Sequence, residues 1–348
     1  MTITDRPQVV LVSGMLGAGK TTLIVESAKR LIRRGRRVGV ITNDQGTGLI
    51  DTSLARVERI PVGEVAGGCF CCRFSDFLGA ALALRERGVE IILAEPVGSC
   101  LDIAATVVRP LMRDEPHRFR VAPLTVLVDP ARIRDLHRLP DEDLSYLFEH
   151  QVAEADLVCL TKADAGGSDA TVEGLVARRI SARSGEGVDE WLEFVLGEYT
   201  MYSGRQLSVD YQRYATAEAA LAWLNWRAEL VLQSPAYPAL VVGPLMEHLD
   251  SALTDIGARI IHVKVLDQTA AGYARISQCA NGQEPSIEGR LDADPSLSHE
   301  LLVNARVIGD PDQISRVVDE ALSSLPARVT VMRREAFRPA EPRPERRA

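Results

Sequence analysis

The first part of the chain alternates short apolar runs with segments of helical period. The apolar runs are rich in Val, Ile and Leu, which is typical of strands buried on both faces of a parallel sheet. They occupy Gln8–Val12, Arg37–Thr42, Glu90–Glu95, Leu124–Asp129 and Asp156–Lys162. The clearest helical segment between them is Lys20–Arg34, which ends before Gly35. This alternation predicts a doubly wound α/β domain with a mainly parallel sheet and right-handed crossovers.

The pattern changes after residue 200 and predicts a smaller C-terminal α+β domain with a mainly antiparallel sheet. Helices are expected over Ala217–Gln233, from Gly243 to Gly257, and over Asp312–Leu325. Strands are expected over Arg259–Leu266, Gly272–Cys279, Leu301–Ile308 and Val329–Met332. The segment Gly282–Ser298 is rich in Gly, Pro, Asp and Ser, so we interpret it as a long loop.

Three parts are therefore predicted along the chain. Residues 1–200 form the α/β domain, and residues 201–335 form the α+β domain. Residues 336–348 form a tail, which from Arg338 onward consists mainly of Pro, Glu and Arg. Because such a segment has little apolar surface to bury, we expect this tail to be disordered.

Composition narrows the class of protein. The 348 residues are 46% apolar and 25% charged, which is ordinary for a soluble globular protein. The net charge of −8 argues against a nucleic-acid partner, and the basic cluster at residues 30–37 is more typical of a solvated helix end. We find neither a signal peptide nor an apolar stretch of membrane-spanning length, so we expect a cytoplasmic protein without a membrane partner. In a reducing compartment its six cysteines are poor candidates for disulfides.

Residues 14–21 fit the phosphate-binding pattern GxxxxGK[ST]. An apolar strand precedes them and a helix follows, which makes a chance match in a Gly-rich turn the weaker interpretation. Backbone N–H groups of such a loop point at phosphate oxygens. We expect Lys20 to reach the β- and γ-phosphates as a catalytic residue and the Thr21 hydroxyl to bind Mg²⁺. The predicted nucleotide contacts in this loop are Gly14, Gly17, Ala18, Gly19, Lys20, Thr21 and Thr22.

Two acidic residues follow predicted strands at the edge of the sheet where ligands bind. Asp44 is a candidate for holding Mg²⁺, and capping of the next turn is its equally weighted alternative. Glu95, in Glu-Pro-Val-Gly, stands where P-loop enzymes place the acid of their second nucleotide motif. It is predicted to hold the Mg²⁺ or to orient the attacking water, and a purely structural role is the weaker alternative.

Two further loops predict the base. Thr161-Lys162-Ala163-Asp164 resembles the Asn-Lys-x-Asp pattern of GTPases, whose aspartate accepts hydrogen bonds from guanine. Adenine lacks that pair of donors, so an ATP complex would leave the carboxylate unpaired. Thr161 departs from the usual Asn, as in GTPases of the signal recognition particle. Ser181 and Ala182 resemble the Ser-Ala loop that backs the base in the same GTPases. GTP is therefore preferred over ATP.

Three cysteines, Cys69, Cys71 and Cys72, follow two glycines within a short segment. Thiolates suit Zn²⁺ or Co²⁺, with Ni²⁺ as a further candidate, and three ligands leave one position of a tetrahedral ion open for delivery. Small buried hydrophobes or a redox pair are the alternatives. Packing alone does not require three cysteines beside two glycines, so metal binding is preferred.

The combination of SGxLGAGKTTL, GCxCC and Glu-x-x-Gly resembles the CobW family of P-loop GTPases, relatives of UreG and HypB, over residues 8–196. The resemblance implies a GTP-dependent metallochaperone with slow intrinsic hydrolysis. It assigns Cys69, Cys71 and Cys72 to the metal and Asp164 to guanine, and it makes Glu95 the family's glutamate. It also implies a client metalloprotein or cofactor enzyme as the partner, with a nucleotide-dependent homodimer as an open question. Unlike many family members, this chain has no His-rich stretch.

Other functions stay open at this point. A GTP-dependent protein that remodels a cofactor enzyme, such as a cobalamin enzyme, would carry no metal itself. A redox sensor at Cys71 and Cys72 would need a thiol of low pKa. An ATP-dependent kinase is disfavoured by Asp164 and Ser181. We favour a GTP-gated metal switch, because the cysteine segment follows a region where a γ-phosphate orders the chain in P-loop proteins.

Overall fold

The computed structural model describes residues 6–46, 50–165, 177–197 and 207–348, and it divides into two compact units. The first unit comprises Met1–Gln45, Leu54–Ala217 and Glu341–Ala348, and the second comprises Gly46–Ser53 and Glu218–Ala340. The boundary expected at residues 200 and 201 lies outside the described residues. No helix in the described ranges is long and apolar enough to cross a membrane.

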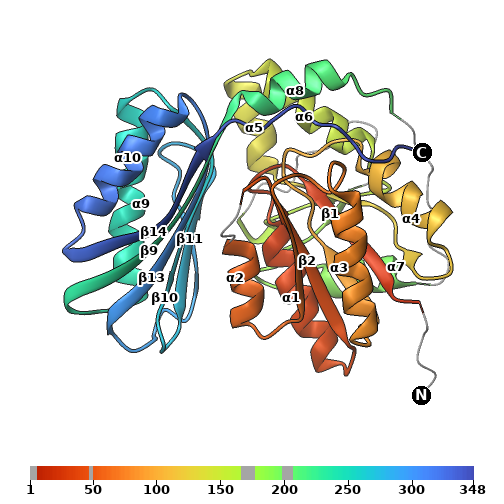
Figure 1. Ribbon diagram of the computed structural model, residues 1–348, viewed down its shortest axis with the longest axis horizontal. Coiled ribbons are helices and arrows are strands. Elements are labelled where there is room, and N and C mark those ends of the chain that lie inside the picture. The colour runs from red at the N-terminus through yellow and green to blue at the C-terminus, as the bar shows by residue number, and fades with distance from the viewer. Residues whose placement is uncertain (1–5, 47–49, 166–176, 198–206) are drawn as a thin grey trace. The chain divides into compact units, whose positions relative to one another are not determined.

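The first unit is built on a parallel sheet, which confirms the predicted α/β class (Figure 1). Among the described residues eight strands belong to it, and all their pairings are parallel. Along the sheet they are β3 (Val62–Ala66), β2 (Val38–Asp44), β4 (Ile91–Ala94), β1 (Gln8–Gly14), β6 (Thr125–Val128), β7 (Leu157–Leu160) and β8 (Ala177–Arg179), with β5 (Arg120–Val121) beside β1. The residues of β1, β4, β6 and β7 are buried throughout, as expected for strands covered on both faces.

The sequence analysis found five of these strands and missed β3, β5 and β8. All three are short and carry few of the apolar residues that mark a buried strand. Helices pack on the sheet, with α1 contacting β1, β2 and β4, and α3 contacting β2 and β3. The helices of this unit are α1 (Lys20–Arg33), α3 (Phe74–Glu86), the π-helix η1 (Ala104–Val108), α4 (Arg109–Asp114), α5 (Pro130–Arg138), α6 (Glu142–Ala153), the 3-10 helix η2 (Ala163–Ala165), α7 (Val188–Leu196) and α8 (Tyr211–Ala219).

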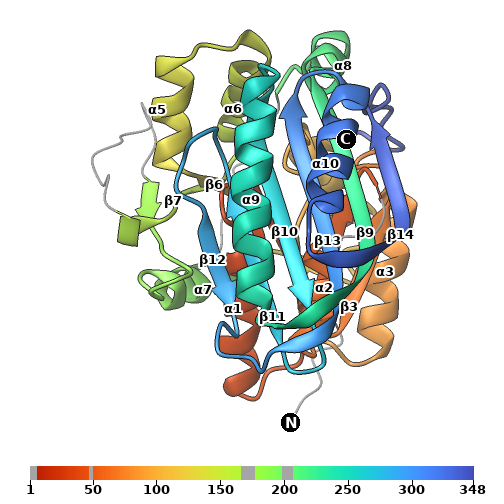
Figure 2. The same cartoon turned by 90° about the vertical axis from the view of Figure 1, so that its left-hand side faces the viewer.

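The second unit is an antiparallel sheet with two helices on one face (Figures 1 and 2). Its six described strands lie in the order β12 (Ser286–Gly289), β11 (Tyr273–Gln278), β10 (Arg259–Gln268), β13 (Ser296–Ile308), β9 (Leu221–Ala236) and β14 (Ala327–Phe337). The helices α9 (Pro238–Asp255) and α10 (Pro311–Ser323) contact this sheet and each other. Between them and the sheet lies an apolar core that includes Leu245, Leu249 and Ile314. The predicted α+β class is therefore confirmed.

The helix predicted over Ala217–Gln233 is wrong, because most of this segment forms the long strand β9. β9 pairs with β13 on one side and with β14 on the other. Its first half, Leu221–Trp226, is buried at every position, so it shows no alternation that would mark a strand. From Arg227 to Gln233 exposed and buried residues alternate, and this is the period-two signal that the helical interpretation overlooked.

Two smaller differences concern element boundaries in the second unit. Helix α9 begins at Pro238, earlier than Gly243, and Pro244 lies inside it. The segment Gly282–Ser298, which was expected to be a loop, contains β12 and the start of β13. Its Gly, Pro and Ser residues mark turns, and β12 has only 4 residues, which is too few to produce a clear apolar pattern.

The segment that directly follows β2 belongs to the second unit. Helix α2 (Ile50–Val57) begins within this segment. The Ile50 amide donates to the Asn304 side-chain oxygen over 3.2 Å, and Lys264 Nζ lies 2.7 Å from the Asp51 carboxylate. The Ile50 side chain also packs with Leu266 and Leu302. The chain that leaves β2 is thus held by strands of the second unit.

The tail differs from the predicted disorder. Strand β14 extends to Phe337, and residues 341–348 belong to the first unit, where Figure 1 places the C-terminus beside α4. The Glu345 carboxylate accepts hydrogen bonds from the Ser75 amide (2.8 Å) and hydroxyl (2.7 Å) at the start of α3. Arg347 Nε lies 2.7 Å from the buried Asp102 carboxylate. Polar contacts hold this segment in place. The prediction of disorder was based on the small number of apolar residues and did not take such contacts into account.

Replacing Glu345 by alanine is expected to lower the free energy of unfolding by about 1 kcal/mol, because the start of α3 loses a carboxylate cap. Urea denaturation measures this change. Glu341→Ala is the matched control, since Glu341 pairs only with the exposed Arg343 in the described structure. Equal effects of the two substitutions would contradict the docking of the tail.

A buried carboxyl group in the first unit gives a pH prediction. Glu154, at the end of α6, is 2% exposed, and its carboxylate accepts a hydrogen bond from the Ala104 amide over 3.1 Å. Burial raises the pKa of Glu154 to about 8. The folded pKa therefore lies above the unfolded value of about 4.3, so stability is greatest below that value and falls as the pH rises to about 8.

Glu154→Gln removes this ionisation and should raise the free energy of unfolding relative to the wild type at pH 8 but much less at pH 5. At pH 8 the free energy of unfolding of Glu154→Gln should exceed that of the wild type by several kcal/mol at most, since one pKa unit corresponds to about 1.4 kcal/mol. Urea denaturation of both proteins at the two pH values measures it. A constant difference between the proteins across this range would contradict the raised pKa.

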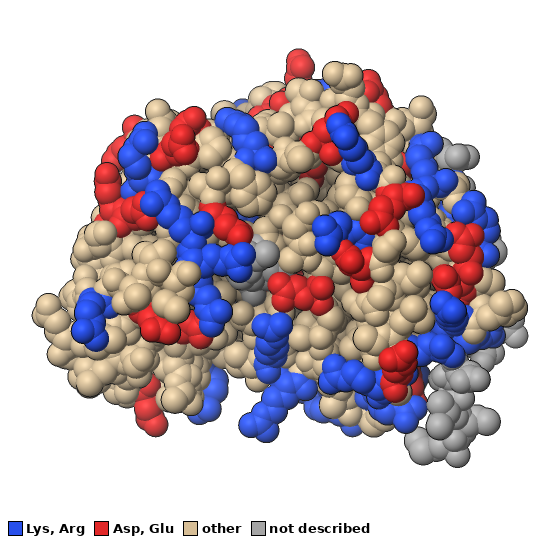
Figure 3. Space-filling view, in the orientation of Figure 1, with Lys and Arg blue, Asp and Glu red and all other residues tan. Residues whose placement is uncertain are grey.

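Acidic and basic side chains are interspersed on the face shown in Figure 3. The basic cluster at residues 30–37 follows this pattern, because its arginines pair with acids of the same unit. Arg30 bonds Glu26 and Asp189, and Arg36 and Arg37 both pair with Glu90. The cluster is thus neutralised within the first unit, in line with its interpretation as a helix end.

Candidate functional site

The candidate site lies along one edge of the parallel sheet. The sheet order β3-β2-β4-β1 brings together the segments that follow these four strands, because the carboxyl ends of parallel strands meet at the same edge. The cysteine segment follows β3, Asn43 and Asp44 end β2, Glu95 follows β4, and the phosphate-binding loop follows β1. Segments far apart in sequence therefore become neighbours.

The phosphate-binding loop runs from the end of β1 into the start of α1. Gly14 has a φ of 132°, and a Cβ atom there would lie 2.4 Å from the Leu127 carbonyl oxygen of β6, so only glycine fits. Lys20 is 6% exposed, and its Nζ donates to the carbonyls of Gly14 (2.8 Å) and Met15 (3.3 Å). The ammonium group thus lies over the loop, at the N-terminus of a helix, where a phosphate group binds favourably.

Two of the predicted magnesium residues, Thr21 and Glu95, lie beside this loop. The buried Thr21 hydroxyl donates to Glu95 Oε1 over 3.0 Å, which joins the start of α1 to the segment after β4. Asp44 ends β2 opposite Ala66 of β3. Hydroxyl and carboxylate oxygens are ligands that Mg²⁺ prefers, so the chemistry of this donor set fits the ion.

Gly98 explains the spacing of the Glu-x-x-Gly motif. A Cβ atom at Gly98 would lie 2.9 Å from the Leu16 backbone nitrogen, so the segment after β4 approaches the phosphate-binding loop more closely than a side chain permits. The Gly98 carbonyl accepts a hydrogen bond from Gln151 of α6 over 2.9 Å. This segment is therefore fixed between α6 and the phosphate-binding loop.

The two loops predicted to recognise the base meet at one side-chain contact. Ser181 Oγ donates to Asp164 Oδ1 over 2.6 Å and accepts from the Ser184 amide over 3.1 Å. Lys162 Nζ lies 2.7 Å from Asp129 Oδ2. Ser181 thus orients the Asp164 carboxylate, a role that the sequence pattern alone did not predict. Recognition of guanine by these residues stays a prediction.

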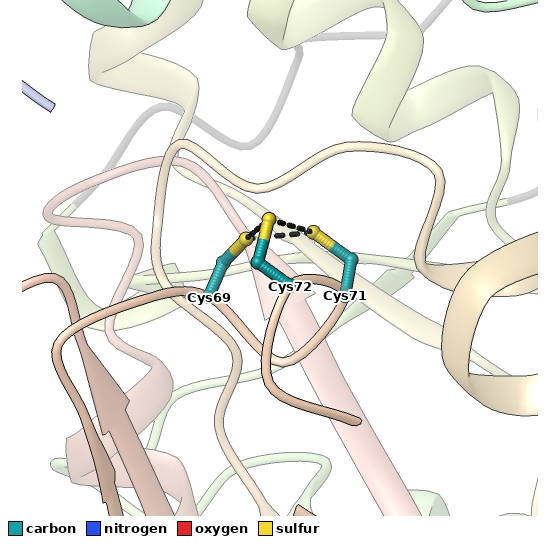
Figure 4. Close-up of side chains that lie close together, drawn as sticks. All are labelled: Cys69, Cys71 and Cys72. Carbon is teal, nitrogen blue, oxygen red and sulfur yellow. Dashed lines mark hydrogen bonds between the residues drawn. The ribbon is translucent and has the colours of Figure 1, made fainter. Parts of the chain in front are cut away.

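The thiol groups of the three cysteines lie close together (Figure 4). The Cys69 sulfur lies 2.6 Å from that of Cys71 and 3.3 Å from that of Cys72, and the last two are 3.7 Å apart. A turn brings them together, since the Cys69 carbonyl accepts from the Cys72 and Arg73 amides, both over 3.0 Å. Cys69 and Cys71 are buried, whereas Cys72 is partly exposed. The described side chains thus form a group able to hold a metal ion.

The thiols influence one another's protonation. Hydrogen bonding with Cys100 is the main cause that raises the pKa of Cys69 and Cys71, and hydrogen bonding with Cys69 raises the pKa of Cys72 to about 11. The thiols are therefore protonated at neutral pH, and an ion that binds here must displace protons. Raised pKa values also argue against a redox sensor, which needs a readily formed thiolate.

Asn43 connects the cysteine segment to the segment that carries Glu95, a role the sequence analysis did not assign to it. Its side-chain nitrogen donates to the Val65 (2.9 Å) and Gly68 (2.7 Å) carbonyls, and its oxygen accepts from the Phe70 amide (2.9 Å). The same oxygen accepts from the Val97 amide over 3.3 Å. One amide group thus holds the ends of β2, β3 and β4 together. Its position at the end of a buried strand is the feature of the sequence that could have identified it.

Cys100 is a second residue that the sequence analysis missed. Its thiol is fully buried and lies 3.8 Å from the Cys71 sulfur. In the sequence it stands far from the other three cysteines, five residues after Glu95. The strand order makes it their neighbour, because β4 lies next to β2 and β2 next to β3.

The docked tail covers the exposed side of the thiol group. The Arg343 amide donates to the Cys72 sulfur over 3.1 Å, and the Glu345 amide donates to the Cys71 carbonyl over 3.0 Å. Cys72 is the thiol that these contacts cover, and it is the most accessible of the three. An ion that enters or leaves on this side must pass the tail.

Comparisons with known proteins identify the family to which this chain is similar. The model of a family described as "CobW/HypB/UreG, nucleotide-binding domain" matches residues 8–186. The protein named Zinc chaperone CobW from Pseudomonas aeruginosa is 32% identical over 193 residues, which cover 45% of this chain and 48% of that protein. Hydrogenase maturation factor HypB from Azotobacter vinelandii is 30% identical over 192 residues, which cover 51% and 56%, respectively. This chain thus spans about half the length of the curated relatives it matches.

Among solved structures, HypB from Helicobacter pylori in complex with nickel is similar to this chain. The sequence identity is 17% and the TM-score is 0.41, over 56% of this chain and 87% of that one.

Proposed function

This chain belongs to the CobW/HypB/UreG family, and from this premise we propose that it is a GTP-hydrolysing metallochaperone. It binds a transition-metal ion at Cys69, Cys71 and Cys72 and releases it to a client protein when GTP is hydrolysed. The ion is Zn²⁺ or Co²⁺, which thiolates bind well, and Ni²⁺ is the next candidate. The client is a metalloprotein or an enzyme of a cofactor pathway. The names of the zinc chaperone CobW and of HypB support this class of function.

One observation carries the proposal, namely the physical link between the phosphate-binding loop and the thiols. Thr21 at the start of α1 bonds Glu95, and the segment after Glu95 bonds Asn43 through the Val97 amide. Asn43 in turn bonds Gly68 and Phe70 beside the cysteines. A change at the γ-phosphate can therefore reach the metal site through these hydrogen bonds and the short backbone segment from Glu95 to Val97 that joins them.

The residues of the chain have distinct roles in this mechanism. The amides of the phosphate-binding loop and Lys20 hold the β- and γ-phosphates, and Thr21, Asp44 and Glu95 would hold Mg²⁺, which neutralises charge on the transferred phosphoryl group. Glu95 also orients the attacking water. Hydrolysis removes the contacts that position Glu95, and Asn43 transmits the change to the cysteine segment. The thiol site then loosens and the ion leaves.

A protein that remodels a client without carrying metal is the alternative function. It predicts that GTP hydrolysis responds to the client alone and that the cysteines bind no ion tightly. Anaerobic titration with Zn²⁺ and Co²⁺ separates the two functions, because stoichiometric thiolate binding supports the metallochaperone and its absence supports the alternative.

Selection of guanine gives a further prediction. Asp164→Ala should weaken GTP binding by roughly 100-fold or more and leave ATP binding nearly unchanged, because guanine loses the acceptor for its N1–H and amino group, whereas adenine lacks this pair of donors. Competition between a fluorescent GTP analogue and each nucleotide measures the preference. Asp156→Ala is the control, since the Asp156 carboxylate accepts a hydrogen bond from the Leu124 backbone amide at the opposite end of β7. Unchanged preference for GTP in Asp164→Ala would contradict the assigned role.

A further inference from the structure

We propose that Cys100 is a fourth ligand of the transition-metal ion, so that the chain closes around its cargo with four thiolates. This inference rests on the proposed function and adds to it a ligand that lies outside the CxCC segment. A fourth ligand changes how the site can release the ion, because a tetrahedral ion bound by four protein ligands has no open position.

Two of the distances between sulfurs fit such a site, and the remaining thiols must shift when the ion binds. Zn²⁺ binds thiolates at about 2.3 Å, so two sulfurs of a tetrahedral site are about 3.8 Å apart. The Cys71 sulfur lies 3.7 Å from that of Cys72 and 3.8 Å from that of Cys100. Two edges of the required tetrahedron are therefore present. The Cys69 sulfur is closer, at 2.6 Å from Cys71, and must move outward by about 1 Å when an ion enters.

The protein holds Cys100 in place through its backbone. The Cys100 amide donates to the Val97 carbonyl over 2.9 Å, and its carbonyl accepts from the Gln151 side chain over 3.1 Å. The next residue, Leu101, donates its amide to the Tyr214 hydroxyl over 3.2 Å. Ligands held in this way lose little freedom on binding an ion, so the fourth thiol is preorganised.

The position of Cys100 also connects the ion to the nucleotide. Cys100 lies on the segment after β4 that carries Glu95, and Glu95 bonds Thr21 of the phosphate-binding site. The other three thiols lie on the segment after β3. When hydrolysis moves the segment after β4, Cys100 is withdrawn from the ion while the CxCC segment keeps three ligands. The open fourth position then accepts a ligand from the client.

Each thiol that binds the ion loses its proton to water, and no oxidation or reduction is involved. The ion passes to the client by exchange of ligands, in which a client side chain replaces Cys100 first.

X-ray absorption at the zinc edge tests the proposal on the full chain loaded anaerobically with one equivalent of Zn²⁺ in the presence of a non-hydrolysable GTP analogue. The wild type should show four sulfur neighbours at about 2.3 Å. Cys100→Ala should show three sulfurs and one lighter atom, with weaker retention of Zn²⁺ against a chelator. Cys159→Ala, which replaces another buried cysteine, in β7, should keep four sulfurs. Circular dichroism and GTP binding confirm folding, and Cys100→Ser serves if Cys100→Ala does not fold.

The outcomes separate this inference from the proposed function. Three sulfurs in the wild type, or four in Cys100→Ala, would overturn the role of Cys100 and leave the metallochaperone function standing. An environment without sulfur in the wild type would overturn both. Four sulfurs in the wild type and three in Cys100→Ala support both.

Discussion

Lys20→Ala is expected to abolish measurable GTP hydrolysis and to weaken GTP binding, while the thiols still take up one metal ion. Lys20 Nζ lies over the phosphate-binding loop, bonded to the Gly14 and Met15 carbonyls. This cation is the group placed to stabilise charge that develops on the γ-phosphate. Loss of one such preorganised donor costs roughly 100-fold or more in rate. Phosphate release and equilibrium binding of a fluorescent GTP analogue measure the two effects.

Lys29→Ala is the matched control, because Lys29 lies on the same helix and pairs with Glu58 at the surface. It should hydrolyse GTP at the wild-type rate. Equal hydrolysis by Lys20→Ala and Lys29→Ala would show that the reaction does not take place at this loop. Loss of metal binding in Lys20→Ala without GTP would show that the substitution disturbs the fold.

Cys71→Ala is expected to weaken metal binding by at least roughly 100-fold, since changes outside the ligand set alone can cost 10- to 100-fold. Cys71 is the central thiol of the group, because its sulfur lies within 3.8 Å of those of Cys69, Cys72 and Cys100. GTP binding without metal should be unchanged. Competition with a chromophoric chelator under anaerobic conditions measures the affinity for Zn²⁺.

Cys159→Ala should bind Zn²⁺ as the wild type does, because Cys159 is buried in β7 and belongs to another strand of the sheet. Wild-type affinity in Cys71→Ala would mean that the ion binds elsewhere. The protein would then fit the alternative in which a client is remodelled without metal transfer at the cysteines.

The features that could be predicted from the sequence are those whose signal is local. The phosphate-binding loop requires a strand, a Gly-rich turn and a helix in immediate succession, and β1 and α1 have these positions. The strands β4, β6 and β7 are buried on both faces, so their apolar runs are easy to recognise. The CxCC segment is also local, because one turn brings its three sulfurs together.

The features that were missed depend on distant parts of the chain. Cys100 joins the other cysteines only through the order of β3, β2 and β4, and spacing along the sequence carries no trace of this order. The long strand β9 lies between β13 and β14 in its sheet, and its first half is buried at every position, so its apolar residues also match a helical period. The tail is held by hydrogen bonds to α3 and the cysteine segment, which composition does not reveal.

The central claim is that the nucleotide controls the affinity for the metal ion, and reciprocal titration tests it most directly. Zn²⁺ affinity is measured anaerobically for the chain bound to a non-hydrolysable GTP analogue and for the chain bound to GDP. Affinities for the GTP analogue and for GDP are each measured with and without Zn²⁺. We predict tighter Zn²⁺ binding in the GTP-analogue form, by roughly 5- to 150-fold, and tightening of the GTP analogue relative to GDP by the same factor when Zn²⁺ is present. Equal affinity for Zn²⁺ in the two nucleotide forms would contradict the account.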